Sequence, residues 1–193
     1  MKERPILFNG SMIRAILSGK KTVTRRALTK SRHPEEIFPC DYSKEEAMVE
    51  LGSTRLGTRW WKSCPYGKPG DRLWVRETWA EVSVTQAPDQ KWIVYRECDN
   101  RTDFGGPWKP SIFMPRRASR ILLEVTDVRV ERLHAITNQQ CIAEGCSGGR
   151  GSIPRYIGNA TVQEHFRHIW ESTGGDYHAN PWVWVVEFKQ VVP

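Results

Sequence analysis

The chain has 193 residues, of which 39% are hydrophobic and 26% are charged, and its formal net charge is +7. These values predict an ordinary globular protein with one sizeable core. No apolar run approaches the roughly 20 residues that span a bilayer, and no signal peptide is evident at the start, so we expect no membrane partner and a cytoplasmic location.

The amino-terminal residues predict a strand, a helix and a second strand. Residues 4–8 are apolar and extended in character, and residues 22–28 are rich in β-branched side chains. Between them, Ser11 is a candidate helix cap, and Gly19 is a candidate helix end. Helical spacing of the apolar side chains supports that helix, namely Met12, Ile13, Ile16 and Leu17.

Positive charge is concentrated where this helix meets the next strand. Residues 11–34 contain seven Lys or Arg residues and no Asp or Glu, which equals the net charge of the whole chain. The densest part is the run Gly-Lys-Lys-Thr-Val-Thr-Arg-Arg at positions 19–26. Such local basicity predicts one positive face that meets an anionic or nucleotide-like ligand.

Residues 30–70 are the least regular part of the sequence, and we expect an insertion or cover here. The pair Ser43 and Glu46 is typical of a capping box and predicts a helix over 44–51. Trp60 and Trp61 lie among cations, a pattern that suits stacking on single-stranded nucleic acid. The alternative is that both tryptophans pack the insertion against the core.

Residues 72–80 predict a strand that carries a carboxylate on its apolar face. Alternation places Leu73, Val75 and Glu77 on the same side. Because an isolated buried charge is costly, Glu77 must either pair with a cation or belong to a site. The sequence leaves both alternatives open.

The remaining residues predict more strands and two short capped helices. Strands are expected at 91–97, 121–125, 128–133 and 182–188, and capping boxes open helices at Thr137 and Thr161. Glu144 would end the first of these helices, where a carboxylate meets the unfavourable end of the helix dipole. That placement suits an acid or a base, or a plain exposed residue. Strands therefore dominate, which predicts a mainly β fold with flanking helices and a partly closed β-barrel.

Three other patterns are ambiguous or uninformative. A basic cluster at Arg116, Arg117 and Arg120 suits either a solvated sheet edge or phosphate contact. The five cysteines include no C-x-x-C pair, which argues against a zinc ribbon or a disulfide framework. His165 and His168 lie three apart on a predicted helix but lack a third ligand, so we identify no metal site and no cofactor.

Taken in order, several motifs resemble the ASCH domain family, especially its longer phage and prophage members. They are the basic run at 19–26, the sequence Gly-Asp-Arg-Leu-Trp-Val at 70–75, Ala-Glu-Gly at 143–145 and the terminal Trp/Val/Phe strand. The resemblance implies a PUA-like β-barrel with a cleft lined by the basic run. It also implies a single domain over 1–193, with insertions near 30–62, 98–115 and 147–160.

The resemblance implies catalytic residues as well. Small ASCH proteins include N4-acetylcytidine amidohydrolases that use a lysine and a threonine of the basic run and a later glutamate. At the matching positions stand Lys21, Thr24 and Glu144, with Glu77 as the alternative carboxylate. The residues expected to contact substrate are Lys20, Thr22, Arg25, Arg26, Trp74 and Arg76. This chain departs from the small enzymes in its insertions and in Arg25, which replaces an aliphatic residue.

These observations lead to one principal hypothesis and two alternatives. The principal hypothesis is hydrolysis of N4-acetylcytidine or a related modified nucleoside. The first alternative is an RNA-binding or other nucleic-acid-binding module, or a ribonuclease, that uses the same basic cleft. A metal-dependent nuclease ranks last because no ligand set is evident. The expected partners are therefore a modified nucleoside or RNA, and no obligate protein partner is evident.

Overall fold

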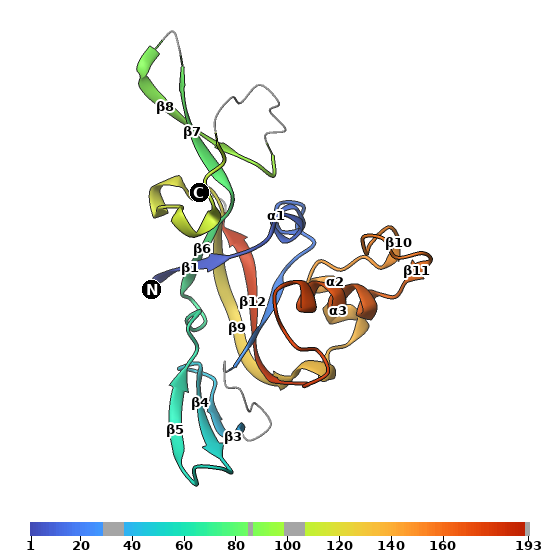
Figure 1. Cartoon of the computed structure of the whole chain (residues 1–193). Helices are drawn as coiled ribbons and strands as arrows, with labels where there is room; N and C mark the ends of the chain where they lie inside the picture. The colour runs from blue at the N-terminus through green and yellow to red at the C-terminus, as the bar shows by residue number, and fades with distance from the viewer. Residues whose placement is uncertain (29–36, 85–86, 99–106, 192–193) are drawn as a thin grey trace.

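A five-stranded sheet forms the centre of the molecule (Figure 1). The computed structural model describes residues 1–28, 37–84, 87–98 and 107–191. The strand order is β1-β6-β9-β12-β2, in which β1 runs parallel to β6 and the other neighbours are antiparallel. The strands are β1 (Glu3–Leu7), β2 (Val23–Ala27), β6 (Arg72–Arg76), β9 (Leu122–Arg132) and β12 (Trp182–Val191).

The two longest strands, β9 and β12, pair along their whole length. β9 has 11 residues and joins the two strands that the sequence predicts at 121–125 and 128–133. β12 lies between β9 and β2, and five of its ten residues are buried. β12 contains the strand expected at 182–188, and its nearly continuous apolar run suits a strand with neighbours on both sides.

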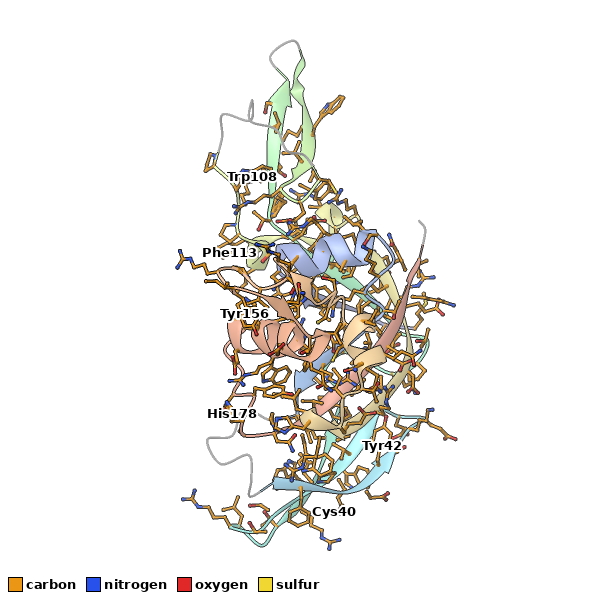
Figure 2. All side chains as sticks on the ribbon, turned by 90° about the vertical axis from the view of Figure 1, so that its right-hand side faces the viewer. Cys40, Tyr42, Trp108, Phe113, Tyr156 and His178 are labelled. Carbon is orange, nitrogen blue, oxygen red and sulfur yellow. The ribbon has the colours of Figure 1, made fainter. Side chains whose placement is uncertain are left out.

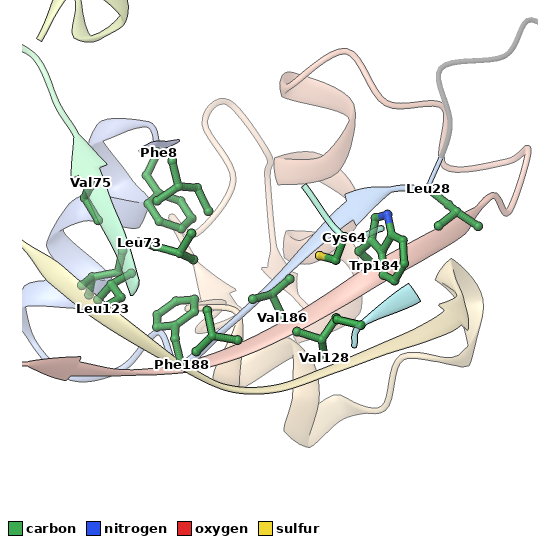
Figure 3. Packing of buried hydrophobic residues seen from close by; sticks show 14 of the residues in the cluster. Phe8, Leu28, Cys64, Leu73, Val75, Leu123, Val128, Trp184, Val186 and Phe188 are labelled. Atoms are coloured by element: carbon green, nitrogen blue, oxygen red, sulfur yellow. The ribbon is translucent and has the colours of Figure 1, made fainter. Parts of the chain in front are cut away.

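Hydrophobic side chains pack on both faces of this sheet. On one face, Phe8, Leu73, Leu123 and Phe188 belong to a cluster that also buries α1, as Figure 3 shows in part. On the other face, the alternate residues of β12 pack under α2 and α3, among them Val183 and Val185. Alternation along β12 therefore supplies two cores, and each fully buried large side chain contributes about 1.5–3 kcal/mol.

The three helices begin where capping side chains lie. They are α1 (Gly10–Leu17), α2 (Asn138–Ala143) and α3 (Val162–Ser172). Thr137 and Thr161 form the predicted capping boxes with Gln140 and Glu164, which confirms both helix starts. α1 begins slightly earlier than predicted, because its cap is Asn9 rather than Ser11.

The first turn of α1 lies against Glu97, which follows strand β8 (Ala87–Tyr95). A Cβ atom at Gly10 would lie only 2.2 Å from Glu97 Oε1. Glu97 also forms an ion pair with Arg14, one turn further along the same helix. Position 10 therefore has no room for a side chain while this contact is made.

Two β-structures extend from opposite ends of the central sheet (Figure 1). One is a three-stranded sheet of β3 (Ile37–Ser43), β4 (Met48–Ser53) and β5 (Arg59–Ser63), and the other is a hairpin of β7 (Trp79–Val84) and β8. Figure 2 shows Cys40 and Tyr42 in the three-stranded sheet. The Tyr42 hydroxyl donates a hydrogen bond to the Val128 carbonyl, which fastens this sheet to β9.

The predicted helix at 44–51 is wrong. Residues 44–47 form a turn, and β4 begins at Met48. Val49 and Leu51 are fully buried and alternate with partly exposed Met48 and Glu50, so pairing with β3 and β5 overrides the local capping signal. In β5, Trp60 packs against the core, whereas Trp61 is 48% exposed.

The described residues are mainly β-strand with few helices, which confirms the broader fold prediction. The expected barrel is not formed, because no sheet among the described strands closes on itself. The two edges of the central sheet, β1 and β2, are connected through α1 instead of pairing with each other. Ile13 and Ile16 of that helix pack into the core cluster that also contains Ile6 of β1 and Leu28 just beyond β2.

Short elements complete the described chain. They are 3₁₀ turns at Ser111–Phe113, Arg116–Ala118 and Leu133–Ala135, and a small ribbon of β10 (Gly149–Arg150) and β11 (Asn159–Ala160). The ribbon lies within the glycine-rich segment 147–160. None of the helices in the described ranges has the length and apolar character needed to cross a bilayer.

Candidate functional site

The basic run lies at the junction of α1 and β2, at the edge of the central sheet. Gly19 adopts a positive φ of 71° and ends α1, and Lys20 is exposed. Lys21 precedes the first residue of β2 and is only 2% exposed. Lys21 therefore lies in the turn between α1 and β2, outside the regular strand. Lys30 and Arg32 of the predicted basic face lie outside the described residues.

Lys21 is the centre of a buried hydrogen-bond cluster. Its Nζ atom donates to the Glu144 carboxylate at 2.6 Å, to the Glu144 carbonyl at 2.9 Å and to the Val23 carbonyl at 2.8 Å. Three acceptors satisfy the three protons of an ammonium group. The side chain is therefore arranged as a cation that holds both the backbone and the carboxylate of Glu144.

Glu144 is placed by the end of α2. Gly145 N donates to the Ile142 carbonyl at 2.8 Å, and Cys146 N donates to the Cys141 carbonyl at 3.0 Å, which together form a Schellman motif. Gly145 has a φ of 94°, and a Cβ atom there would lie 2.9 Å from Ala15 Cβ. Glycine is thus required both by the turn and by the close approach of α1.

Cys141 and Cys146, which bracket Glu144, are buried parts of the same core cluster. Burial raises the pKa of the Cys146 thiol to about 12 and that of Cys141 to about 11. Such thiols remain protonated and unreactive near neutral pH. All five cysteines are free, which agrees with the sequence argument against a disulfide framework.

Arg25 is the second cation on Glu144. Its side chain is fully buried, and it lies 3.4 Å from Glu144 Oε1 and 3.3 Å from Glu131 Oε2. Glu131 in turn accepts a hydrogen bond from Arg129 on β9. Buried Lys21 and Arg25 thus face two carboxylates, which limits the cost of burying their charges.

The pKa of Lys21 is shifted by two opposing effects. Burial lowers the pKa of the ammonium below its usual value, and the nearby Arg26 charge acts in the same direction. The charge and hydrogen bond of Glu144 oppose this shift without cancelling it. Lys21 is therefore easier to deprotonate than an exposed lysine.

A cavity of about 650 Å³ opens beside β2. Small-molecule sites span roughly 300–1,000 Å³, so this volume suits a compact organic ligand. Thr24 and Glu144 both line the cavity, together with Arg25 and Arg26. Apolar and aromatic walls come from Met12, Tyr66, Phe166, Ile169 and Trp170, and the segment 173–181 contributes further lining residues. Lys21 is not among the lining residues, because it lies behind Glu144.

Glu77, the alternative carboxylate, lies in a different environment. It is 1% exposed and accepts two parallel hydrogen bonds from Arg120, at 2.9 Å and 2.8 Å. Arg120 also stacks on Tyr95, with its guanidinium 3.9 Å from the ring centroid. Glu77 does not line the cavity, and its contacts here are those of a structural ion pair. It lies at the break between β6 and β7, which the sequence predicts as one strand.

The expected substrate-contacting residues do not all gather at the cavity. Arg25 and Arg26 line it, whereas Lys20 and Thr22 are exposed in the turn and outside its lining. Trp74 and Arg76 stack on each other on β6, with the guanidinium 4.7 Å from the ring centroid, and also lie outside the lining.

Most cations of the two basic clusters are paired with carboxylates or carbonyl groups. In the basic run and the helix before it, Arg14, Lys21 and Arg25 form the pairs described above. Arg26 donates to the Leu7 carbonyl at 2.6 Å. In the second cluster, Arg116 pairs with Glu3 and Arg117 pairs with Glu81. These contacts leave less charge free for phosphate. The second cluster does not form the expected sheet edge either, because Arg116 and Arg117 lie in a 3₁₀ turn and Arg120 in the segment that follows it.

The sequence did not single out several residues that the fold brings to the site. Glu131 joins Arg25 only because β9 and β2 both pair with β12. Tyr66 and Trp170 reach the cavity from distant segments, and no local motif marks them. Within the described parts of the chain, no three His, Cys, Asp or Glu side chains are arranged to hold a metal ion.

The chain matches no protein-family profile, no curated protein and no solved structure.

Proposed function

We propose that this protein is an amidohydrolase that removes the acyl group from N4-acetylcytidine or a closely related modified nucleoside. The observation that carries this proposal is the Glu144 residue, which lines a cavity of about 650 Å³ and pairs with two buried cations, Lys21 outside the lining and Arg25 on the cavity wall. Thr24 lies on the wall of the same cavity. The proposal includes an ASCH-type, PUA-like relationship for the chain as a single domain and a cytoplasmic location.

In the proposed reaction, Glu144 carries the proton. Its carboxylate takes a proton from water while the water oxygen attacks the acyl carbon. Arg25 stabilises the negative charge that develops on the acyl oxygen. Collapse of this intermediate breaks the carbon–nitrogen bond, and Glu144 returns the proton to the exocyclic nitrogen. One water is consumed, and cytidine and acetic acid are released.

Lys21 and Thr24 support this chemistry in different ways. The three hydrogen bonds of Lys21 make it a positioning residue that fixes Glu144, rather than the base that abstracts the first proton. Thr24 is 2% exposed and lines the cavity. Its proposed role is to bind the attacking water or the acyl oxygen.

The test is release of cytidine from N4-acetylcytidine by the purified protein. Turnover is expected for the wild type and should be lost in Glu144→Gln. Glu77→Gln is the matched control, because Glu77 is also buried and paired but does not line the cavity. Absence of turnover in the wild type, or full turnover in Lys21→Ala, would refute the proposal.

Nucleic-acid binding through the same cleft is the weaker candidate. It requires free cations along the basic run, whereas Lys21 and Arg25 are buried and paired with Glu144. The exposed Lys20 remains available. RNA binding that weakens steeply with salt and depends on Lys20 would favour this candidate.

A further inference from the structure

The cavity runs along the free edge of β2. Side chains of successive strand residues point to opposite faces, yet Thr24, Arg25, Arg26 and Ala27 all line this one cavity. Lining residues also come from both sides of the sheet. Tyr66 packs with the core cluster of one face and Trp170 with that of the other. Only a cavity along the edge of the strand, where the backbone forms the wall, meets both conditions.

The pairing with β12 shows which backbone groups face this cavity. Leu28 N donates to the Trp182 carbonyl at 2.8 Å, and Phe188 N donates to the Thr22 carbonyl at 2.9 Å. In an antiparallel pair these bonds recur at every second residue. The peptide groups of Val23, Arg25 and Ala27 therefore point away from β12.

Two of these outward residues still have free peptide groups. The Val23 carbonyl is occupied, since it accepts a hydrogen bond from Lys21 Nζ. The N–H and C=O groups of Arg25 and Ala27 have no hydrogen-bond partner within the described residues. Arg25 and Ala27 are two residues apart, or about 7 Å along an extended strand. The edge thus presents donors and acceptors in a row that begins beside Glu144.

We infer that the free edge of β2 recognises a pyrimidine ring through main-chain hydrogen bonds, with the Ala27 N–H donating to the ring carbonyl oxygen. This inference rests on the proposed function and assigns ring recognition to the backbone rather than to the arginines. The acylated exocyclic nitrogen then lies toward Glu144, at the other end of the row. Aromatic side chains of Tyr66 and Trp170 border the same cavity and supply apolar contact for the ring.

The test uses a matched pair of ligands and a matched pair of variants. N4-acetylcytosine carries the ring carbonyl, and 4-acetamidopyrimidine lacks this carbonyl together with the adjacent ring N–H. Ala27→Pro removes the outward N–H and breaks no bond to β12, and proline is tolerated at such an edge position. Ala27→Ser keeps the N–H. Binding is measured by calorimetry, with Glu144→Gln present in every protein to prevent turnover.

Without further substitution, the Glu144→Gln protein should bind N4-acetylcytosine about tenfold more tightly than 4-acetamidopyrimidine, the usual effect of one hydrogen bond. Ala27→Ser should keep this preference, and Ala27→Pro should abolish it. Equal binding of the two ligands before any change at Ala27, binding of neither ligand, or an unchanged preference in Ala27→Pro would overturn the inference.

The ligand comparison remains decisive even if Ala27→Pro does not fold, because it needs no change at Ala27. Failure of the proposed function gives a different result. In that case the wild-type protein would release no cytidine from N4-acetylcytidine, while the preference for the ring carbonyl would persist.

Discussion

Glu144 and Glu77 are both buried glutamates with cationic partners, yet only one lies at a cavity. Glu77 is held by a single guanidinium that satisfies both oxygens at 2.8–2.9 Å. Glu144 is held unevenly, with Oε2 at 2.6 Å from Lys21 and Oε1 at 3.4 Å from Arg25. The loosely bound oxygen retains capacity for another partner, and its residue lines the cavity. Burial and pairing alone therefore do not identify a reactive carboxylate.

Removal of the Glu77 carboxylate is expected to have the largest effect on stability. Glu77→Ala leaves Arg120 without its partner in a mostly buried position and should lower the free energy of unfolding by about 3–5 kcal/mol. Chemical denaturation measures this change. The double variant Glu77→Ala, Arg120→Ala should recover part of the loss. A loss below about 1 kcal/mol, the range of exposed ion pairs, would contradict the structural assignment.

The largest expected effect on activity comes from Glu144. Glu144→Gln keeps the shape of the side chain but removes its ability to accept and return a proton, so kcat should fall at least about 100-fold. Steady-state hydrolysis of N4-acetylcytidine measures this fall. Glu77→Gln, corrected for the folded fraction, should stay within about threefold of wild type, well below the effect of a lost proton carrier. Equal losses in the two variants would remove the distinction between the glutamates.

Gly145 tests whether the backbone placement of Glu144 matters. Gly145→Ala forces a side chain into the left-handed region and against Ala15, which should cost roughly 1–2 kcal/mol of stability. Because Glu144 is the neighbouring residue, kcat should fall as well, with a smaller change in KM. Gly19→Ala is the control, since Gly19 also has a positive φ but no atom lies near its would-be Cβ. Comparable activity losses in both variants would argue against a specific role for Gly145.

The smallest effect is a pH dependence caused by Lys21. Burial lowers its pKa in the folded state below the unfolded value of 10.5. Between these two pKa values the unfolded chain binds more protons, so the contribution of Lys21 to stability rises with pH. Relative to Lys21→Met, the wild type should gain unfolding free energy as the pH increases toward 10.5. The difference in unfolding free energy between the wild type and the variant cancels the contributions of the other titrating groups. A difference that decreases as the pH rises would contradict the direction of the Lys21 pKa shift.

Local signals in the sequence predicted local structure well. Thr137 and Thr161 begin helices because their side chains satisfy nearby backbone donors, and Gly19 ends one because it accepts a positive φ. The buried, charged character of Glu77 also followed from alternation along one strand. Each of these depends on residues within a few positions of one another, which the sequence displays directly.

Contacts between distant segments were harder to predict from the sequence. Lys21 and Glu144 are 123 positions apart, and they entered the same hypothesis through motif resemblance rather than through any spacing rule. Glu131 was missed because its approach to Arg25 depends on the register of three strands. The helix predicted at 44–51 was wrong for a similar reason, since pairing with β3 and β5 outweighed local preference. The expected barrel is not formed because the edge strands β1 and β2 do not pair with each other.

The contact between Gly10 and Glu97 connects the carboxyl-terminal end of the β7–β8 hairpin to the first turn of α1. The carboxylate occupies the space that any side chain at position 10 would need. A methyl group added there would displace the end of the Glu97 side chain, although the residue changed belongs to α1 and not to the hairpin. A substitution at position 10 can therefore test this attachment without any change in the hairpin itself.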